Sequence, residues 1–467
     1  MPLVNNYNNL GLNQVVNPLI QPKGEFIQLI NVDPYPFGAK TKRGGFSTYL
    51  GTPDGGTVNS LFNWTRNNGT QFWNYRSSGS TLYYSTQGTG AWTVCGNGTV
   101  PNGAIVRRAV SADTLVVTSA NGTTRHSTNG TSFTDTVGAP AGPDITEYQG
   151  RIWVPGSNLN YSNLGTPTDW VNDSSFVVVP NEGKINSSFV VGDWLYSTKD
   201  SGLMYQQNGF EDFNDMSTKV GPTSVRSIVE KEGVKFWINR LGYFAFGGGK
   251  PELISNPIQP QVYNKLDTGI AGAVFDTAPS GQFKYDIHTA VGTLTDDLTR
   301  ETISNAVHVY DFRLNEWRDY SIPNFFPTAY NTYKDVNGVE QFIFGDAFGQ
   351  CYTFDGSPTD NGHPINSVMQ MIYDGGSPGQ DKRWKKIWLF FNPGCRAQVS
   401  IAAENTFHPN TKTWIPLGDA ESGVVEFIFP PETRSKLIFI KITESSKDAP
   451  FTYYGFSCDY EFEGMNR

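Results

Sequence analysis

Two adjacent acidic pairs, Glu211-Asp212 and Asp296-Asp297, are the candidate carboxylates for acid–base chemistry in this sequence. A glycosidase places two carboxyl groups on either side of the bond that it cleaves. A sialidase also needs a group of arginines to bind the carboxylate of its substrate. Both acidic pairs fall in predicted turns or insertions, so nothing brings them to a common centre. We therefore predict no catalytic residue, and we expect that the protein is not an enzyme.

The five histidines are scattered, and none has a second ligand two to four residues away. His308 and Asp311 are close enough in sequence to form a dyad, but a solvated histidine on a strand is the more common situation. No glycine-rich phosphate loop follows a predicted strand. The sequence therefore predicts neither a bound metal nor a cofactor.

The four cysteines, Cys95, Cys351, Cys395 and Cys458, are far apart and form no CxxC pair. So few cysteines in 467 residues predict free, buried thiols in preference to a disulfide framework or a zinc site. The first residues lack the basic start and apolar run of a secretory signal. No apolar stretch reaches about 18 residues, so we expect no membrane insertion.

A repeated unit organises the middle of the chain. Residues 158–170 (NLNYSNLGTPTDW) read as an alternating strand, a tight turn and a closing tryptophan. Weaker copies end in the apolar residues Trp92, Phe133, Phe213 and Leu253, so that successive copies lie 37 to 43 residues apart. A period of about 40 residues with about four short strands is typical of a β-propeller blade.

Composition supports the same fold class. Aromatic residues make up 14% of the chain and charged residues 17%, with 49 glycines and 28 prolines, which favours strands joined by tight turns. We predict an all-β protein, a six- or seven-bladed β-propeller followed by a small antiparallel β-sandwich. The blade number depends on how the long sixth segment, with its insertion at residues 293–302, is divided.

Three regions follow from these patterns. Residues 1–56 lack the repeat and are predicted to be an extended arm that contributes strands, either by completing the last blade or by reaching a neighbouring subunit. Residues 57–362 form the propeller, and residues 363–467 form the sandwich. Residues 436–442 (KLIFIKI) alternate most clearly, so this strand is expected to be central in its sheet.

Two basic segments and one acidic insertion are the candidate contact sites. The turn Lys40-Thr41-Lys42-Arg43 lies in the arm, and the cluster Lys382-Arg383-Trp384-Lys385-Lys386 opens the sandwich. The possible subunit or partner contacts are Lys42, Arg43, Asp296, Asp297, Arg383 and Trp384. The net charge of -9 argues against a surface that holds nucleic acid tightly, although it suits a conduit through which DNA slides.

The order of these parts resembles the propeller-type tail hub or nozzle proteins of tailed bacteriophages, also called DNA-stabilisation proteins. The residues that carry the resemblance are Gly11-Leu12-Asn13, Lys42-Arg43-Gly44, the blade ends at residues 161–170 and 309–317, and the cluster at residues 381–386. The insertion at residues 293–302 departs from the pattern.

The resemblance implies a structural virion protein of the tail. It would form a homo-oligomeric ring, a hexamer, below the portal or adaptor and beside other tail proteins. Genomic DNA would be retained by the ring and would pass through it at ejection without sequence readout. The alternative is a carbohydrate-binding or glycan-hydrolysing propeller in a receptor-binding tail component.

Overall fold

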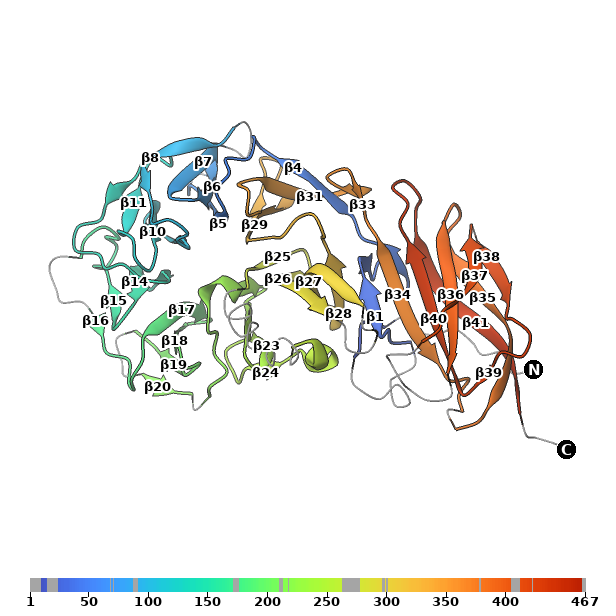
Figure 1. Ribbon diagram of the computed structural model, residues 1–467. Coiled ribbons are helices and arrows are strands. Elements are labelled where there is room, and N and C mark those ends of the chain that lie inside the picture. Colours follow the sequence, from blue (N-terminus) through green and yellow to red (C-terminus); the bar gives the residue numbers. More distant parts are fainter. Residues whose placement is uncertain are drawn as a thin grey trace.

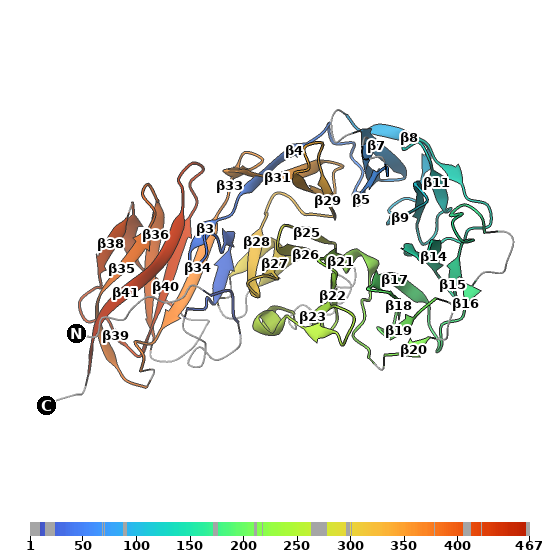
Figure 2. The same cartoon turned by 180° about the vertical axis from the view of Figure 1, so that it is seen from behind.

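Small antiparallel sheets stand next to one another in a ring, and a two-layered β-sandwich lies against one side of that ring (Figure 1). The view from behind shows the same arrangement (Figure 2). This computed structural model describes the chain except for residues 1–9, 15–23, 68, 70, 87–90, 171–175, 210–212, 217, 263–277, 296–298, 300, 378, 405–411, 422 and 464–467.

Five sheets of the ring have four strands each, and their strands follow one another in chain order. The first contains β5 (Val58–Thr65), β6 (Phe72–Ser78), β7 (Thr81–Thr86) and β8 (Thr93–Thr99). The second contains β9 (Arg107–Ser111), β10 (Thr114–Thr118), β11 (Arg125–Ser127) and β12 (Thr134–Asp135). The third contains β13 (Thr146–Tyr148), β14 (Arg151–Pro155), β15 (Leu159–Tyr161) and β16 (Phe176–Val177).

The fourth sheet contains β17 (Ile185–Val191), β18 (Trp194–Lys199), β19 (Met204–Gln207) and β20 (Asn214–Asp215). The fifth contains β21 (Val229–Lys231), β22 (Val234–Asn239), β23 (Gly242–Phe246) and β24 (Glu252–Leu253). The short 3-10 helices η1 (Val225–Ser227) and η2 (Asn256–Ile258) lie before and after this sheet. Phe133, Phe213 and Leu253, which close three copies of the sequence repeat, lie at or next to the fourth strands of their sheets, so one repeat corresponds to one sheet.

The sixth sheet contains β25 (Ser280–Phe283), β26 (Asp286–Thr295), β27 (Thr302–Asp311) and β28 (Glu316–Ser321). In the seventh, β29 (Ala329–Lys334), β30 (Glu340–Gly345) and β31 (Cys351–Ser357) are followed by β4 (Gly45–Tyr49) from the N-terminal arm. The seventh sheet also includes β32 (Thr359–Asp360) and β33 (His363–Pro364). The last of these strands therefore belongs to the ring, although residue 363 was the predicted start of the sandwich.

The first strands of the sheets line the inside of the ring. Along the chain, β5 contacts β9, β9 contacts β13 and β13 contacts β17; β21 contacts β25, β25 contacts β29, and β29 returns to β5. Aromatic side chains fill the space between sheets, as where Phe189 of the fourth sheet lies 6.0 Å from Trp237 of the fifth. Because each sheet is covered on both faces, every residue of β6 and β10 is buried. The described strands thus confirm the all-β propeller, with seven sheets around the ring.

The sandwich has two layers with a shared apolar core. One layer contains β34 (Ser367–Tyr373), β40 (Leu437–Glu444), β36 (Ala397–Glu404) and β37 (Ile415–Ala420). The other contains β2 (Val32–Asp33), β3 (Lys40–Lys42), β41 (Thr452–Phe462), β35 (Lys382–Phe391) and β38 (Val424–Ile428), with β39 (Arg434–Ser435) beside β35. As expected from its alternation, β40 is central, between β34 and β36.

One strand of the arm joins the two parts. β1 (Gln28–Ile30) pairs in parallel with β28 of the sixth sheet and antiparallel with β34 of the sandwich. The result is a continuous nine-stranded sheet that runs from β25 to β37, and both ribbon views show β1 next to β34 (Figures 1 and 2). The arm therefore contributes strands to the sixth sheet, the seventh sheet and both layers of the sandwich.

Candidate functional site: the axial cavity and the predicted contact residues

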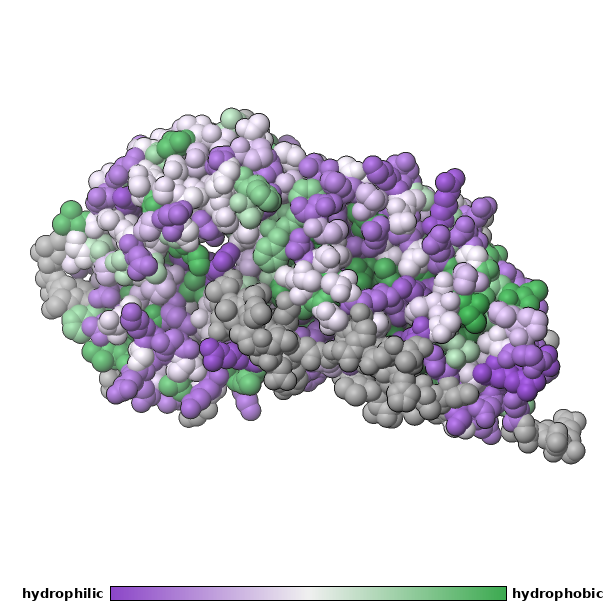
Figure 3. All heavy atoms as spheres, in the orientation of Figure 1, coloured by the Kyte–Doolittle hydropathy of each residue, from purple (hydrophilic) through white to green (hydrophobic). Residues whose placement is uncertain are grey.

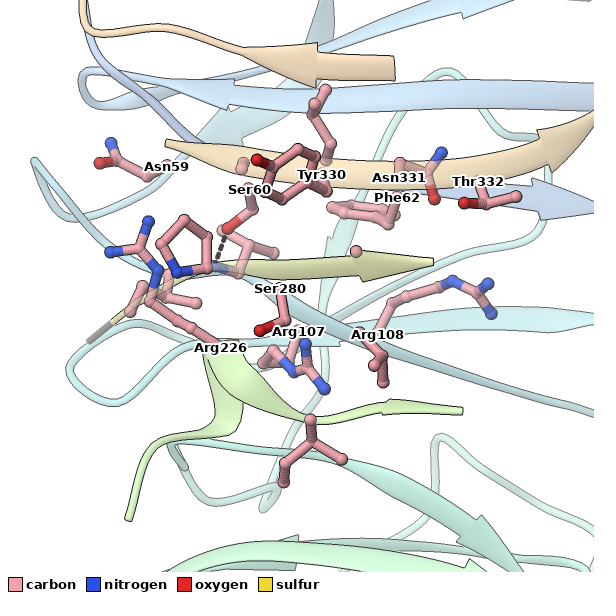
Figure 4. A pocket seen from close by; sticks show the side chains of 18 of the residues that line it. Asn59, Ser60, Phe62, Arg107, Arg108, Arg226, Ser280, Tyr330, Asn331 and Thr332 are labelled. Atoms are coloured by element: carbon pink, nitrogen blue, oxygen red, sulfur yellow. Dashed lines mark hydrogen bonds between the residues drawn. The ribbon is translucent and has the colours of Figure 1, made fainter. Parts of the chain in front are cut away.

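A cavity of about 370 Å³ opens on the inside of the ring (Figure 4). Its walls are the beginnings of the inner strands β5, β9, β21, β25 and β29, so it lies on the axis of the propeller. Polar links join neighbouring sheets here. Ser60 Oγ accepts a hydrogen bond from the Val106 amide at 2.7 Å, and Thr328 Oγ1 donates to the Val58 carbonyl at 2.7 Å.

Three arginines line this cavity. Arg107 and Arg108 are consecutive residues of β9, and consecutive side chains on a strand point to opposite faces. Arg107 Nε therefore reaches Asp144 before the third sheet at 3.1 Å, whereas Arg108 lies near Asn63 of the first sheet. Arg226, in η1, donates from Nη2 to the Thr328 carbonyl. Figure 4 shows the three arginines on different sides of the cavity.

The cavity is positively charged. The surrounding walls and the neighbouring Arg107 lower the pKa of Arg108 to about 10, and burial lowers the pKa of Arg226. Arg108 remains cationic at neutral pH, since a pKa of about 10 is still well above 7. Glu230 carries the one carboxylate among the described residues of the lining, and it pairs with Lys235.

This arrangement attracts an anionic group such as a carboxylate or phosphate. The described lining does not present the paired carboxyl groups of a glycosidase. Sequence reasoning did not identify these arginines. The available signal was the Arg107-Arg108 pair in β9, which precedes the apolar strand β10. Only the closed ring, however, brings Arg226 to the same cavity.

The predicted contacts in the arm are wrong for two residues. Arg43 is 2% exposed, and its guanidinium binds both carboxylate oxygens of Asp360 at 2.8 and 2.5 Å. Lys42 Nζ pairs with the buried Glu444 at 2.8 Å. These side chains face the interior because their partners come from β32 and β40, so neither is available to another subunit. Lys40 completes the set by pairing with Glu316 of β28 at 2.9 Å.

The basic cluster of the sandwich divides in two. Trp384 is 2% exposed and donates from Nε1 to Ser435 Oγ at 2.9 Å, so its predicted role as a contact is also wrong. Lys382 is buried and donates to three backbone carbonyls. Arg383 is exposed and lies 3.7 Å from Glu432, so it remains a candidate contact. Alternation along β35 explains this division, because Lys382 and Trp384 point inward and Arg383 points outward.

The candidate acidic pairs Glu211-Asp212 and Asp296-Asp297 lie outside the described residues. The sequence suggested that His308 is solvated, but the structure shows it fully buried. Its Nδ1 lies 2.7 Å from the Tyr243 hydroxyl. Asp311 instead accepts a hydrogen bond from Tyr35 at 2.6 Å. The four cysteines are free and buried, which confirms that prediction.

Among the described residues, no group of three or more histidine, cysteine and acidic side chains is placed to hold a metal ion. No helix in the same residues is long and apolar enough to cross a membrane.

Comparisons with known proteins find likeness in fold. The WD40 β-propeller domain of Doa1 matches with a TM-score of 0.42 and 11% identity, over 67% of this chain and 97% of that one. BamB from Moraxella catarrhalis matches with a TM-score of 0.38 and 11% identity, over 69% of this chain and 93% of that one. YCF48 from Cyanidioschyzon merolae matches with a TM-score of 0.41 and 10% identity, over 66% of this chain and 98% of that one. No protein family matches the sequence, and no curated protein matches it.

Proposed function

We propose that this chain is a structural subunit of a bacteriophage tail, a hub or nozzle protein that forms a hexameric ring below the portal or adaptor. The genome would be retained by this ring and conducted through it at ejection. The proposal starts from the resemblance of the residue patterns to those of such proteins, and one observation about the fold supports it.

That observation is the way the arm ties the two parts together. Three basic residues in and just after β3 bind three different strands: Lys40 binds Glu316 of β28 in the propeller, Lys42 binds Glu444 of β40 in the sandwich, and Arg43 binds Asp360 of β32 in the seventh sheet. Next to them, β1 continues the sixth sheet into the sandwich. A hinge between propeller and sandwich would have to break backbone hydrogen bonds and buried ion pairs together. The molecule is therefore a rigid two-part block, as a load-carrying ring requires.

The surface agrees with such a role. In Figure 3, hydrophilic side chains are spread over both ring and sandwich, mixed with side chains of intermediate hydropathy and with several hydrophobic areas. The net charge of -9 limits tight binding of the DNA backbone, so DNA would slide past with little attraction.

The test is the mass of the assembly. The full chain is purified alone and together with the portal or adaptor protein of the same phage, and both samples are measured by native mass spectrometry and analytical ultracentrifugation. We expect a closed ring in the mixture. A protein that remains monomeric beside its partner would contradict the proposal.

Arg383 provides a sharper version of the test. Arg383→Glu reverses an exposed charge on the sandwich, whereas Lys334→Glu reverses an exposed charge on the seventh sheet. If the sandwich contacts its neighbour through this strand, Arg383→Glu weakens the ring and Lys334→Glu does not. Equal assembly of the two variants would show that Arg383 is not part of the interface.

A further inference from the structure

Two of the three arginines that line the axial cavity have no carboxylate partner. Arg107 forms an ion pair with Asp144 at 3.1 Å, but neither Arg108 nor Arg226 forms an ion pair with a described residue. A guanidinium stays protonated in proteins, and an enclosed charge costs free energy unless an opposite charge lies nearby. Burial lowers the pKa of both arginines, as expected for enclosed cations without a counter-charge. An anion in the cavity would offset this cost.

Both guanidinium groups can be reached from the cavity. Arg108 is exposed, and its Nη2 lies 3.5 Å from Asn63 Oδ1, a distance at which a hydrogen bond is weak. Arg226 is partly exposed and donates from Nη2 to the Thr328 carbonyl. Its Nε and Nη1 form no hydrogen bond with a described residue and are not sealed from solvent. Each arginine therefore has N–H groups that a ligand can bind.

Glu230 is the one carboxylate among the described residues of the lining. It is exposed and forms a close ion pair with Lys235 of the neighbouring strand β22, so its charge is balanced at short range. Arg107 is balanced in the same way by Asp144. The two positive charges that remain unbalanced in the described lining are those of Arg108 and Arg226.

These two arginines lie toward different ends of the cavity. Arg226 binds the carbonyl of Thr328, whose hydroxyl donates to the carbonyl of Val58 at the beginning of β5. Arg108 instead lies beside Asn63, five residues further along the same strand. A strand rises about 3.3 Å per residue, so the two levels are about 15 Å apart. Figure 4 also shows Arg226 and Arg108 apart, on different sides of the cavity.

A ligand that neutralises both arginines must be elongated. A charge-assisted hydrogen bond from a guanidinium spans about 2.9 Å, so a bridging ligand has its two anionic groups roughly 9 Å apart. We infer that the axial cavity binds a small elongated molecule with an anionic group, carboxylate or phosphate, at each end, one on Arg108 and one on Arg226. The uncharged residues that make up the rest of the described lining suit an uncharged body between the two ends. The cavity volume of about 370 Å³ is within the range of small-molecule sites.

This site is independent of the proposed tail role. The cavity lies within the propeller of a single chain and needs no second copy, whereas the ring depends on contacts between copies. Ligand binding and ring assembly can therefore succeed or fail separately.

Ligand length provides the first test, on the unaltered full chain. Isothermal titration calorimetry at low salt, in a buffer without phosphate, compares succinate, adipate and suberate, whose two carboxylates are progressively further apart. Octanoate has the same chain length as suberate but one carboxylate, so it is the matched single anion. We expect affinity to rise from succinate to suberate. Suberate should bind at least about tenfold more tightly than octanoate, because it makes a second charge-assisted contact.

A bisphosphonate with the same spacing as suberate distinguishes the two kinds of anionic group. If it binds more tightly than suberate, the ligand carries phosphate-type groups; if it binds more weakly, the ligand is a dicarboxylate. Either result agrees with a site for two separated anions.

Substitutions in the lining provide the second test. Arg108→Gln and Arg226→Gln each remove one charge but keep a polar side chain, and each should weaken suberate binding at least about tenfold. Glu230→Gln removes the carboxylate of the described lining and should strengthen binding. Arg383→Gln removes an exposed arginine of the sandwich and is the matched control, with the affinity of the unaltered protein.

Three results would overturn the inference. They are no suberate binding at millimolar concentration, octanoate binding as tight as that of suberate, and unchanged suberate affinity in Arg108→Gln. Arg226→Gln also loses the hydrogen bond to Thr328. If that variant fails to fold, the length series on the unaltered protein and the exposed Arg108 still decide the question.

Discussion

Arg43 and Asp360 lie 317 residues apart in the chain and form a bidentate ion pair at 2.8 and 2.5 Å. The guanidinium also donates from Nε to Asn31 Oδ1 at 2.8 Å and lies over the ring of Tyr320 at 5.0 Å. Both charged side chains are almost fully buried. This pair fixes the beginning of the arm strand β4 against the end of the propeller, where the ring closes.

Removing one partner of this pair should be costly. Arg43→Ala leaves the Asp360 carboxylate buried without its cation, which costs about 3–5 kcal/mol in systems of this kind. Arg383→Ala, on an exposed pair 3.7 Å apart, should cost less than about 1 kcal/mol. Urea unfolding followed by tryptophan fluorescence measures both. Similar midpoints for the two variants would show that Arg43 does not hold the arm.

The closing strand β4 is also anchored by Phe46. This side chain is fully buried and meets Phe344 and Phe325 edge to face, at 4.9 and 5.1 Å. Phe46→Ala should lower the free energy of unfolding by about 3–5 kcal/mol through the lost contacts and the cavity. Phe37→Ala, at a side chain that is 84% exposed, is the control and should change little. Limited proteolysis should release the arm in Phe46→Ala first; an arm that stays protected would contradict this assignment.

Gly130 is required where the second sheet meets the first. Its φ is +80°, and a Cβ atom there would lie 2.2 Å from the ring of Trp73, while its carbonyl accepts a hydrogen bond from Tyr75. Gly130→Ala combines a left-handed backbone, at about 1–2 kcal/mol, with an overpacked core, at about 1–3 kcal/mol. Gly249→Ala meets no atom within 4 Å and should be neutral. Thermal unfolding separates the two, and an unchanged melting temperature for Gly130→Ala would count against the packing described.

Asp286 should make stability depend on pH in an unusual direction. Burial raises its pKa to about 6, against the opposing effect of Arg318. The folded protein therefore holds this proton more tightly than the unfolded chain does, so the carboxyl stabilises the fold most below pH ~4 and loses that effect as the pH rises through 6. Asp286→Asn does not titrate. The melting temperature of the unaltered protein relative to this variant should fall between pH 4 and pH 7, and a constant difference would contradict the raised pKa.

The four thiols should not react with a labelling reagent until the protein unfolds. Burial raises the pKa of Cys351 and Cys395 to about 12 and that of Cys95 and Cys458 further. The reactive thiolate is then scarce at pH 8, and the sulfur atoms are covered. Ellman's reagent should label no thiol in the native protein and all four in guanidinium chloride. Rapid labelling of one thiol under native conditions would show that its region opens.

Local patterns were sufficient for much of the fold. The closing residues Phe133, Phe213 and Leu253 reveal the repeat because each sheet is a consecutive meander whose strands pair with sequence neighbours. The alternation of residues 436–442 similarly predicts a central strand, and the scarcity of cysteines predicts free thiols. These features depend on residues that are close in sequence, so they can be predicted from the sequence alone.

The sites were decided by the tertiary structure. Lys42 and Arg43 have the composition of an exposed basic turn, and only Glu444 and Asp360, more than 300 residues later, turn them inward. The axial arginines share this dependence, since ring closure creates the cavity that they line. Periodicity and turn chemistry act over a few residues and were enough to specify a β-propeller with a sandwich. Burial of a charge or an imidazole depends on what packs against it from distant parts of the chain, which no local pattern contains.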